Sequence, residues 1–284
     1  MGKPRILVID GNRAATREQQ VAAGGQGSGE GYVDVLRRLA PLACDIVRPA
    51  DGAVEFPSGV ALSDYDGVAI TGSALNIYDG GAHIERQIEL TRAVLDSGVP
   101  CFGSCWGMQV AVTALGGRVR PNPLGREFGF ARRIALTESG RQHPMYREKP
   151  AVFEAVTVHR DDIEQLPPGA VVLASSDMGV QAVELQHGRA RFWGVQYHPE
   201  YSYADIAATT MRYAEVLLRE RWFLARAALE AFVVDLKALQ EQPQDHYLGW
   251  KHGLGPAMQD ERLKLAELHN WLELVVMRGF QQRH

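Results

Sequence analysis

One cysteine stands in a setting that favours nucleophilic chemistry. Cys105 is the centre of the pentapeptide GSCWG at residues 103–107, between a short apolar run and a helical pattern that begins near Met108. Glycine two residues before and two after the central residue lets a strand turn sharply into a helix, as in the nucleophile elbow of hydrolases. At a helix N-terminus, unpaired backbone N–H groups and the helix dipole favour thiolate over thiol. Taken alone, the pentapeptide also fits a buried cysteine that only packs in a glycine-rich turn.

A base and its partner follow a second strand-like run. Residues 191–197 lead into His198-Pro199-Glu200. A cysteine nucleophile needs an imidazole to take its proton, and the imidazole needs a group that fixes its tautomer. Pro199 restricts the backbone, and residues two apart at a strand end can project to the same side. A lone His-Pro-Glu is more typical of a satisfied surface or core histidine, but together with the elbow it predicts a triad of Cys105, His198 and Glu200.

Three blocks together make the sequence resemble the class I glutamine amidotransferases, which hydrolyse glutamine to ammonia through a cysteinyl thioester. The blocks are ITGS at residues 70–73, GSCWGMQ at 103–109 and GVQYHPE at 194–200, in the order that the family uses. Residues 126–131 and the segment around His159 are most similar to the glutaminase half of GMP synthases. The resemblance covers roughly residues 4–215, about three quarters of the chain.

The resemblance also implies an oxyanion hole. The backbone N–H groups of Gly72 and Trp106 match the positions that the family uses to stabilise the tetrahedral oxyanion, an interaction on which about a hundredfold or more in rate depends. Gly72 suits this role because an amide that points inward often requires a conformation that only glycine adopts easily. Without the other motifs, Thr71-Gly72-Ser73 would be a plain turn.

For substrate binding, the family uses a glutamine four residues after the nucleophile and the backbone around a histidine. The matching positions here are Gln109, Val158, His159 and Arg160. GMP synthases have Ser-His-Gly-Asp at the histidine, so this chain departs from them at Val158 and Arg160. Arg160 is either a pocket residue that binds a carboxylate or a solvated loop charge. Trp106 and Met108 either shape the pocket or pack the helix.

Composition is that of an enzyme rather than of a nucleic-acid or membrane protein. The chain has 284 residues, 46% of them hydrophobic, and a formal net charge of −4 with scattered basic residues, which gives no footprint for nucleic acid. No apolar stretch is long enough to span a bilayer and the N-terminus has no signal-peptide pattern, so we expect a cytoplasmic protein. Three cysteines argue against a disulfide framework. Cys101 and Cys105 lack the spacing and partners of a metal site, so we expect neither metal nor cofactor.

Alternating strand and helix patterns predict an α/β fold: an open, mostly parallel, flavodoxin-like sheet flanked by helices. Short β-branched runs at residues 5–10, 45–48, 67–70 and 99–102 are typical of buried strands, and helices are expected at 32–42, 84–97 and 110–115. The glycine-rich residues 24–31 are expected to form a flexible loop; the alternative, a phosphate cradle, lacks the Lys-Ser/Thr that would follow. Because motifs follow strands, they should meet at the carboxyl ends of the sheet.

The second half of the chain changes pattern. Residues 118–195 contain short strands and turns that resemble the antiparallel flap of the family. Helices are expected at 204–220, 224–240 and 260–277, and we divide the chain into an amidotransferase-like domain, 1–220, and a helical C-terminal extension, 221–284. An apolar stripe in the last helix is expected to pack on its own domain, with a partner surface as the alternative; it consists of Leu265, Leu268, Leu272, Val275 and Val276.

Two enzymatic functions fit these motifs. The first is a glutaminase that supplies ammonia to a separate synthetase, since no synthetase-type phosphate loop follows in the sequence. The second is a stand-alone hydrolase of γ-glutamyl amides or peptides, in which Trp106, Arg160 and the C-terminal extension would meet the amine. In either case the substrate is glutamine or a γ-glutamyl amide. A non-catalytic regulatory protein is disfavoured by the intact set of Gly72, Cys105, His198 and Glu200.

Overall fold

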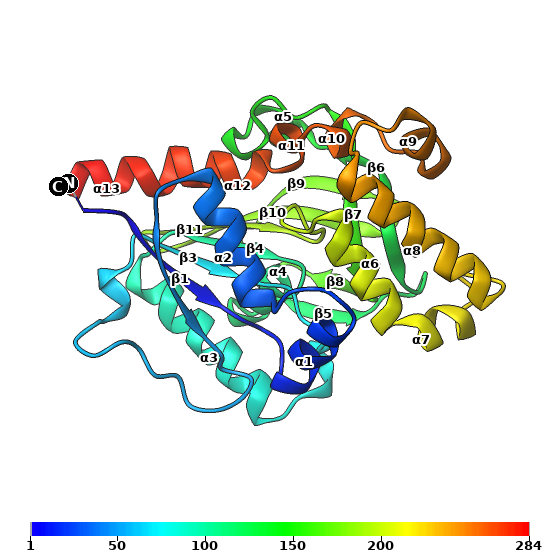
Figure 1. Cartoon of the computed structure of the whole chain (residues 1–284). Helices are drawn as coiled ribbons and strands as arrows, with labels where there is room; N and C mark the ends of the chain where they lie inside the picture. Colours follow the sequence, from blue (N-terminus) through cyan, green and yellow to red (C-terminus); the bar gives the residue numbers. More distant parts are fainter. Residues whose placement is uncertain (1, 284) are drawn as a thin grey trace.

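A nine-stranded mixed sheet forms the centre of the molecule, in the strand order β2-β1-β3-β4-β11-β10-β9-β6-β7. The structure, a computed structural model, describes residues 2–283 (Figure 1). The first five strands in this order run parallel to one another. They are β2 (Ala43–Val47), β1 (Arg5–Ile9), β3 (Gly67–Ile70), β4 (Cys101–Ser104) and β11 (Ala190–Val195). This parallel half confirms the predicted fold class.

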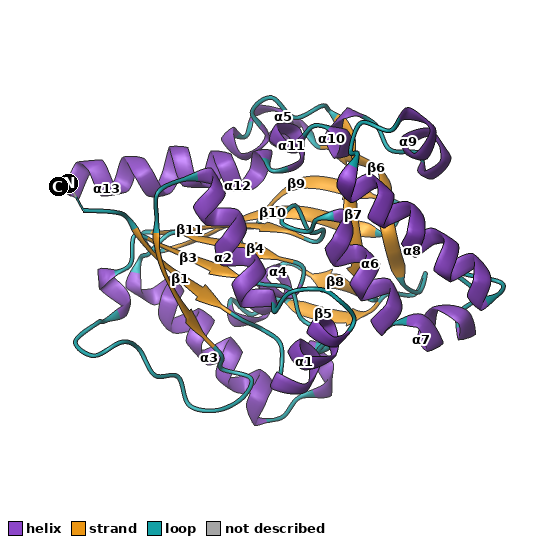
Figure 2. Ribbon diagram, viewed as in Figure 1, coloured by secondary structure: helices purple, strands orange, loops and turns teal. Residues whose placement is uncertain are grey.

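Alternate residues of the central strands bury opposite faces of the sheet. Ile6 and Val8 of β1 belong to one apolar cluster, and Leu7 and Ile9 belong to the other. This alternation follows from the two-residue period of a strand. On the first face lies α2 (Ser28–Leu39), and on the second lie α3 (Ala82–Ser97) and α4 (Trp106–Ala114). Figure 2 shows the resulting layers, with helices on both sides of the strands. Strands covered on both faces read as continuous apolar runs, which is why they were recognisable in the sequence.

Antiparallel strands extend the sheet beyond β11. They are β6 (Glu127–Leu136), β7 (Val152–His159), β9 (Val171–Ser176) and β10 (Gly179–His187). A separate two-stranded ribbon pairs β5 (Arg118–Pro121) with β8 (Asp161–Gln165). The antiparallel segment expected before the histidine motif is therefore present, but its strands continue the main sheet and reach ten residues in length. The connection from β6 to β7 contains α5 (Glu138–Gln142) and a 3₁₀ turn at Pro144–Tyr146, and two further 3₁₀ turns, Leu62–Asp64 and Ile77–Asp79, lie before and after β3.

Helices of the C-terminal third pack back on the first part of the chain. They are α6 (Tyr203–Arg212), α7 (Ala214–Arg219), α8 (Arg226–Glu241), α9 (His246–His252), α10 (Pro256–Gln259), α11 (Glu261–Lys264), α12 (Ala266–Trp271) and α13 (Arg278–Arg283), with a π-helical stretch at Leu272–Met277. Trp271 lies against Phe102 of β4, their ring centroids 5.9 Å apart. Leu265, Leu268 and Val276 share the apolar cluster of Ile6 and Val8. The apolar stripe thus packs on its own domain, as the pattern predicted.

The glycine-rich segment forms the predicted loop only over residues 24–27, and for residues 28–31 the prediction of a loop was wrong. Helix α1 (Ala14–Ala22) precedes it, and α2 begins inside it at Ser28 rather than at Tyr32. At Gly29 the helix lies so close to the sheet that an added Cβ would stand 2.9 Å from Ile46 Cγ2. The N–H of Gly29 donates to Asp10 Oδ2 at 3.1 Å, which satisfies one of the free amides of the first turn. Burial of one helix face offsets the low helix propensity of glycine here.

Two predicted helices are divided. The helix expected over 204–220 breaks at Tyr213 into α6 and α7, and the one expected over 260–277 is interrupted at Leu265. In α6 the hydroxyl of Thr210 donates to the carbonyl of Ile206 at 2.7 Å, a local bond that bends helices. Over residues 2–283, none of the helices has the combination of length and apolar character that a membrane span requires.

Candidate active site

The turn at Cys105 is a strained strand-to-helix elbow. Cys105 connects β4 to α4 with φ 51° and ψ −102°, a conformation that costs energy for any residue with a Cβ. An added Cβ at Gly103 would lie 2.7 Å from the backbone of Gly107, and one at Gly107 would lie 2.5 Å from the carbonyl of Ile70. Both glycines are therefore required by close packing. The N–H of Cys105 donates to the carbonyl of Val195 at 2.7 Å, which fixes the elbow beside the strand that precedes His198.

The structure brings His198 and Glu200 together with Cys105. His198 Nδ1 lies 2.8 Å from Glu200 Oε1, and both side chains are buried. Because a carboxylate only accepts, Nδ1 carries a proton in its bond to Glu200, and Nε2 is the nitrogen that faces the thiol. Burial works to lower the pKa of His198, but the charge of Glu200 and hydrogen bonds with Cys105 and Glu200 outweigh it and raise the pKa to about 10. The motif lies just beyond β11, where the N–H of His198 donates to the carbonyl of Val156 at 2.8 Å.

Gly72 lies against the imidazole of His198. An added Cβ at Gly72 would stand 2.4 Å from His198 Cε1, whereas its backbone does not have the positive φ that favours glycine. Glycine is thus required because the imidazole of His198 lies too close for a side chain. The sequence had led us to expect a different reason, a backbone conformation that only glycine adopts easily. The carbonyl of Gly72 accepts hydrogen bonds from Thr71 Oγ1 at 2.9 Å and from Asn12 Nδ2 at 3.4 Å. These bonds fix the loop on which an oxyanion donor would stand.

The backbone N–H of Trp106 stands at the start of α4, while the side chain packs away from the site. As the first residue of α4, Trp106 has an N–H without a partner inside the helix. Its indole is fully buried with Ile84 and Val110, and Nε1 donates to Gln87 Oε1 at 2.7 Å. The side chain of Trp106 therefore packs the helix and does not shape the substrate pocket. Met108 is likewise buried in the core.

A cavity opens beside Cys105 and contains the predicted substrate-binding residues. Gln109, Val158, His159 and Arg160 all line it, together with residues 73–76, Arg126, Asp161 and Tyr213. The imidazole of His159 is buried between Glu127 Oε2 at 2.8 Å and the carbonyl of Asp161 at 2.9 Å. It therefore holds the backbone of the wall in place. Arg160 is exposed at the mouth.

Gln196 is a site residue that sequence reasoning missed. Its Nε2 lies 3.4 Å from Cys105 Sγ, and its Oε1 accepts from Gln109 Nε2 at 3.2 Å. The two buried amides thus link the wall of the cavity to the thiol. The signal in the sequence was its position two residues before His198 in the motif at 194–200, where alternate residues share a direction.

Arg126 and Tyr213 form a further part of the wall that the sequence did not predict. Arg126 makes a two-pronged bond to Glu220, with Nε–Oε2 at 2.8 Å and Nη2–Oε1 at 3.3 Å. Its guanidinium carbon lies 5.2 Å from the ring centroid of Tyr213. Arg126 holds the pKa of the Glu220 carboxyl below its usual range, chiefly through the hydrogen bond. This wall is built at the break between α6 and α7, and no local pattern in the sequence indicated the break.

The arrangement supports acyl transfer through a thiol. Cys101, by contrast, lies in the core with its thiol pKa raised by burial, so the two cysteines occupy different chemical settings. Within the described part of the chain, no group of three or more His, Cys, Asp or Glu side chains is arranged to hold a metal ion.

Comparison with known sequences agrees with this geometry. A model of the family "Glutamine amidotransferase class-I" matches residues 33–212. A γ-glutamyl-L-1-hydroxyisopropylamide hydrolase from a Pseudomonas species is 34% identical over 98% of this chain and 95% of its own length. The GMP synthase of Thermomicrobium roseum is 34% identical over 51% of this chain, and the match spans 25% of that synthase.

Solved structures have the same fold. A glutamine amidotransferase from Thermotoga maritima superposes with a TM-score of 0.63 at 20% identity, over 97% of this chain and 99% of that one. Another glutamine amidotransferase, from Methylobacillus flagellatus, gives a TM-score of 0.57 at 20% identity, over 90% of this chain and 96% of that one.

Proposed function

Because this chain belongs to the class I glutamine amidotransferase family, we propose that it acts alone as a hydrolase of γ-glutamyl amides of small amines. It is a hydrolase of C–N amide bonds, and its substrates are glutamine or related γ-glutamyl amides. We propose that substituted γ-glutamyl amides are hydrolysed in preference to glutamine, and that the released amine is not passed to a synthetase.

In the proposed mechanism, the thiolate of Cys105 attacks the γ-carbonyl carbon of the substrate. The N–H groups of Gly72 and Trp106 stabilise the oxyanion that forms, and His198 gives its proton to the departing amine. A γ-glutamyl thioester remains on Cys105. His198 then takes a proton from water, the water attacks the thioester, and glutamate leaves as the thiolate is restored. Glu200 keeps Nδ1 of His198 protonated, so that Nε2 faces the thiol in both steps.

The share of this chain that each relative matches supports a stand-alone hydrolase. The γ-glutamyl amide hydrolase matches 98% of this chain, whereas the GMP synthase matches 51% of it. The family model ends at residue 212, while the cavity wall also contains Tyr213, and Glu220 holds the wall residue Arg126; both Tyr213 and Glu220 lie beyond that end. We place the amine part of the substrate against this wall. Trp106, expected to meet the amine, is buried away from the cavity.

The competing function is ammonia supply to a separate synthetase. It is favoured by the similarity to GMP synthases, which the chain matches over only a quarter of their length. In that case the purified protein should hydrolyse glutamine slowly, and a partner should accelerate it.

A substrate panel tests the proposal. Purified protein is incubated with glutamine and with γ-glutamyl amides of ethylamine, isopropylamine and hydroxyisopropylamine, and glutamate release is measured. We expect kcat/KM for at least one substituted amide to exceed that for glutamine by about tenfold or more, the difference that 1.4 kcal/mol of binding to the amine would give. Fast hydrolysis of glutamine with no hydrolysis of the substituted amides would overturn the proposal.

We also propose that the protein works in the cytoplasm. Cys105 must stay reduced to act, and the three cysteines are free thiols in the structure.

A further inference from the structure

The second carboxylate oxygen of Glu200 points away from His198 and has its own partner. Glu200 Oε2 accepts a hydrogen bond from Ser104 Oγ at 2.9 Å, and Ser104 Oγ lies 3.0 Å from the hydroxyl of Tyr32. Ser104 and Tyr32 are both almost completely buried, at 0% and 1% exposure. No part of the hydrolytic mechanism above uses them.

The number of protons on each group determines which group donates in the two hydrogen bonds of Ser104. An ionised carboxylate can only accept, so the single hydroxyl proton of Ser104 points to Glu200. The remaining contact therefore has Tyr32 as donor and Ser104 as acceptor. The chain of donors runs from Tyr32 to Ser104 to Glu200, while His198 donates to the other oxygen of the same carboxylate.

We propose that Ser104 and Tyr32 are positioning residues for hydrolysis, which hold the Glu200 carboxylate in the plane and rotamer that orient His198 toward Cys105. The inference rests on the proposed roles of the triad. Ser104 is the residue before the nucleophile and ends β4, so one elbow would carry both the thiol and the anchor of its acid partner.

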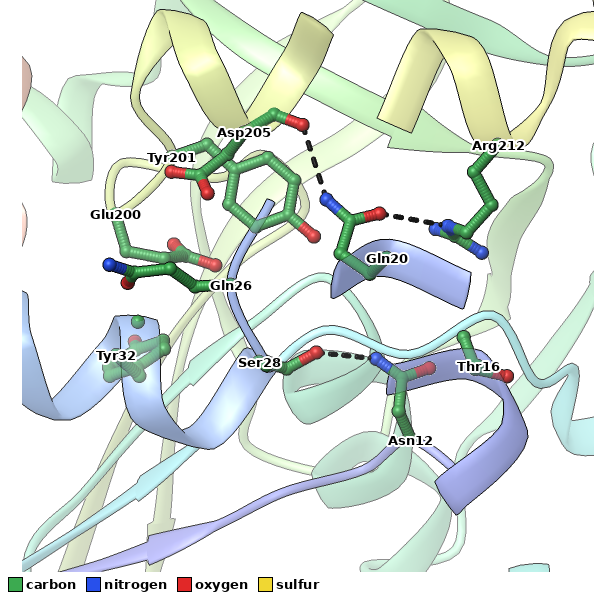
Figure 3. A pocket seen from close by; sticks show the side chains of 12 residues that line it. Asn12, Thr16, Gln20, Gln26, Ser28, Tyr32, Glu200, Tyr201, Asp205 and Arg212 are labelled. Atoms are coloured by element: carbon green, nitrogen blue, oxygen red, sulfur yellow. Dashed lines mark hydrogen bonds between the residues drawn. The ribbon is translucent and has the colours of Figure 1, made fainter. Parts of the chain in front are cut away.

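The surroundings of Glu200 explain why such an anchor is needed. Glu200 and Tyr32 also line a cavity, distinct from the substrate cavity, between the segment at residues 12–32 and α6 with the residues just before it. Figure 3 shows Glu200, Gln26, Ser28 and Tyr201 among the residues that line this cavity. Without the hydroxyl of Ser104, Oε2 would lose its buried donor, and rotation toward the polar groups of this cavity would satisfy it. Such a rotation would release His198.

The glycine-rich segment at residues 24–31 positions Tyr32, the residue that follows it. Because Gly29 has no side chain, α2 can approach Ile46 and Asp10 closely, and one turn later Tyr32 reaches Ser104 beneath the elbow. The segment that had no function in the sequence thus begins the helix that places the first donor of the chain.

Conservative variants test the proposal. Ser104→Ala removes a hydrogen bond to a charged group, for which we expect kcat to fall about ten- to hundredfold. Tyr32→Phe removes a neutral hydroxyl one step away, for which we expect a fall of about three- to tenfold. The assay uses the γ-glutamyl amide that the wild-type protein hydrolyses fastest. KM should stay within about twofold of wild type, because neither side chain lines the substrate cavity.

Coupling and controls separate positioning from general destabilisation. In the Ser104→Ala background, Tyr32→Phe should have no further effect on kcat, whereas Ser104→Thr, which keeps the hydroxyl, should retain most of it. Tyr65→Phe is the matched control, because it removes a buried phenol that donates to Asp45 at 3.0 Å at the opposite end of the sheet. It should leave kcat unchanged. Thermal unfolding of each variant checks folding.

Three results would overturn the inference: an unchanged kcat in folded Ser104→Ala, independent effects of the two substitutions, or a rise in KM at constant kcat. If the wild-type protein instead hydrolyses no substituted amide but hydrolyses glutamine, the proposed substrate class fails, and the positioning roles are then tested on glutamine with the same variants.

Discussion

At the scale of single residues, the site depends on the groups that contact the buried imidazole of His198. His198 has Glu200 at Nδ1, Cys105 on its other side and the ring of Tyr201 stacked on its face at 4.1 Å. Burial lowers the pKa of His198 and the charge of Glu200 raises it, with a net rise from 6.5 to about 10. The protonated imidazole that gives its proton to the leaving amine is therefore stabilised by the fold.

Replacing Glu200 tests this pairing. In Glu200→Gln the pKa of His198 should fall, and kcat/KM should drop at least about a hundredfold because the imidazole loses its orienting group. The pKa is raised in the folded state, so the pairing stabilises the wild type fully below the unfolded value of 6.5, and this contribution is lost as pH rises through about 10. In the variant the loss should occur at lower pH. NMR titration of His198 and urea unfolding across this range measure both effects.

The control is Glu89→Gln, an exposed carboxylate on α3. It should match wild type in both measurements. A pKa of His198 that stays near the wild-type value in Glu200→Gln would contradict the assignment of Glu200 as its cause.

At the residue level, the sequence indicated which side chains would lie together, while their catalytic roles stay a prediction. Cys105, His198 and Glu200 were predicted because the elbow and the His-Pro-Glu motif occur together, although each alone has a common structural explanation, and the structure brings the three side chains together. Gln196, Ser104 and Tyr32 were missed since their bonds depend on side-chain rotamers and on contacts between residues far apart in the sequence. For Ser104 and Tyr32 nothing local marks such contacts, whereas the position of Gln196 two residues before His198 was a signal.

At the scale of elements, the positions at which helices and strands end determine which residues line the substrate cavity. The parallel strands β1, β3, β4 and β11 were predictable because they are largely apolar, and the last three of these lead directly into the motifs. The break between α6 and α7 was not, because the helical pattern continues through Tyr213 while tertiary contacts and a local Thr210 bond change the course of the backbone. The break matters because it brings Tyr213 to the cavity wall.

Tyr213 should therefore control preference for the amine. In Tyr213→Ala we expect kcat/KM for a branched γ-glutamyl amide to fall about tenfold, from lost contact with the ring, while that for glutamine stays within about threefold. Tyr213→Phe should retain the preference. Parallel kinetics with both substrates give the answer, and Tyr247→Ala, an exposed tyrosine of α9, is the control. Equal losses for the two substrates would show a general effect and contradict the placement of the amine.

At the scale of the whole molecule, the C-terminal segment is joined to the catalytic core by a buried ion pair. Lys149 Nζ lies 2.9 Å from Glu267 Oε1, with side-chain exposures of 2% and 0%. Tyr197, next to His198 in the sequence, donates to the same oxygen of Glu267 at 2.7 Å. The division at residue 220 stays a prediction, and these contacts lead us to expect that residues 221–284 unfold together with the first part of the chain in one transition.

Breaking the pair should be costly. Glu267→Gln leaves the Lys149 ammonium buried without its counter-charge, and we expect the free energy of unfolding to fall by about 3–5 kcal/mol. The double variant Lys149→Met/Glu267→Met removes both charges and should recover much of that loss. Urea denaturation measures each value. A single variant within about 1 kcal/mol of wild type, or a double variant that is less stable than the single one, would contradict this account.

The central claim is that Cys105 carries the γ-glutamyl group during hydrolysis. The most direct measurement is acid quenching of the protein during turnover of a γ-glutamyl amide, followed by mass spectrometry of the intact chain and its peptides. We predict an adduct with the mass of one γ-glutamyl group on the peptide that contains Cys105, and neither adduct nor hydrolysis in Cys105→Ala. Hydrolysis by Cys105→Ala at the wild-type rate, or an adduct on another residue, would contradict the claim.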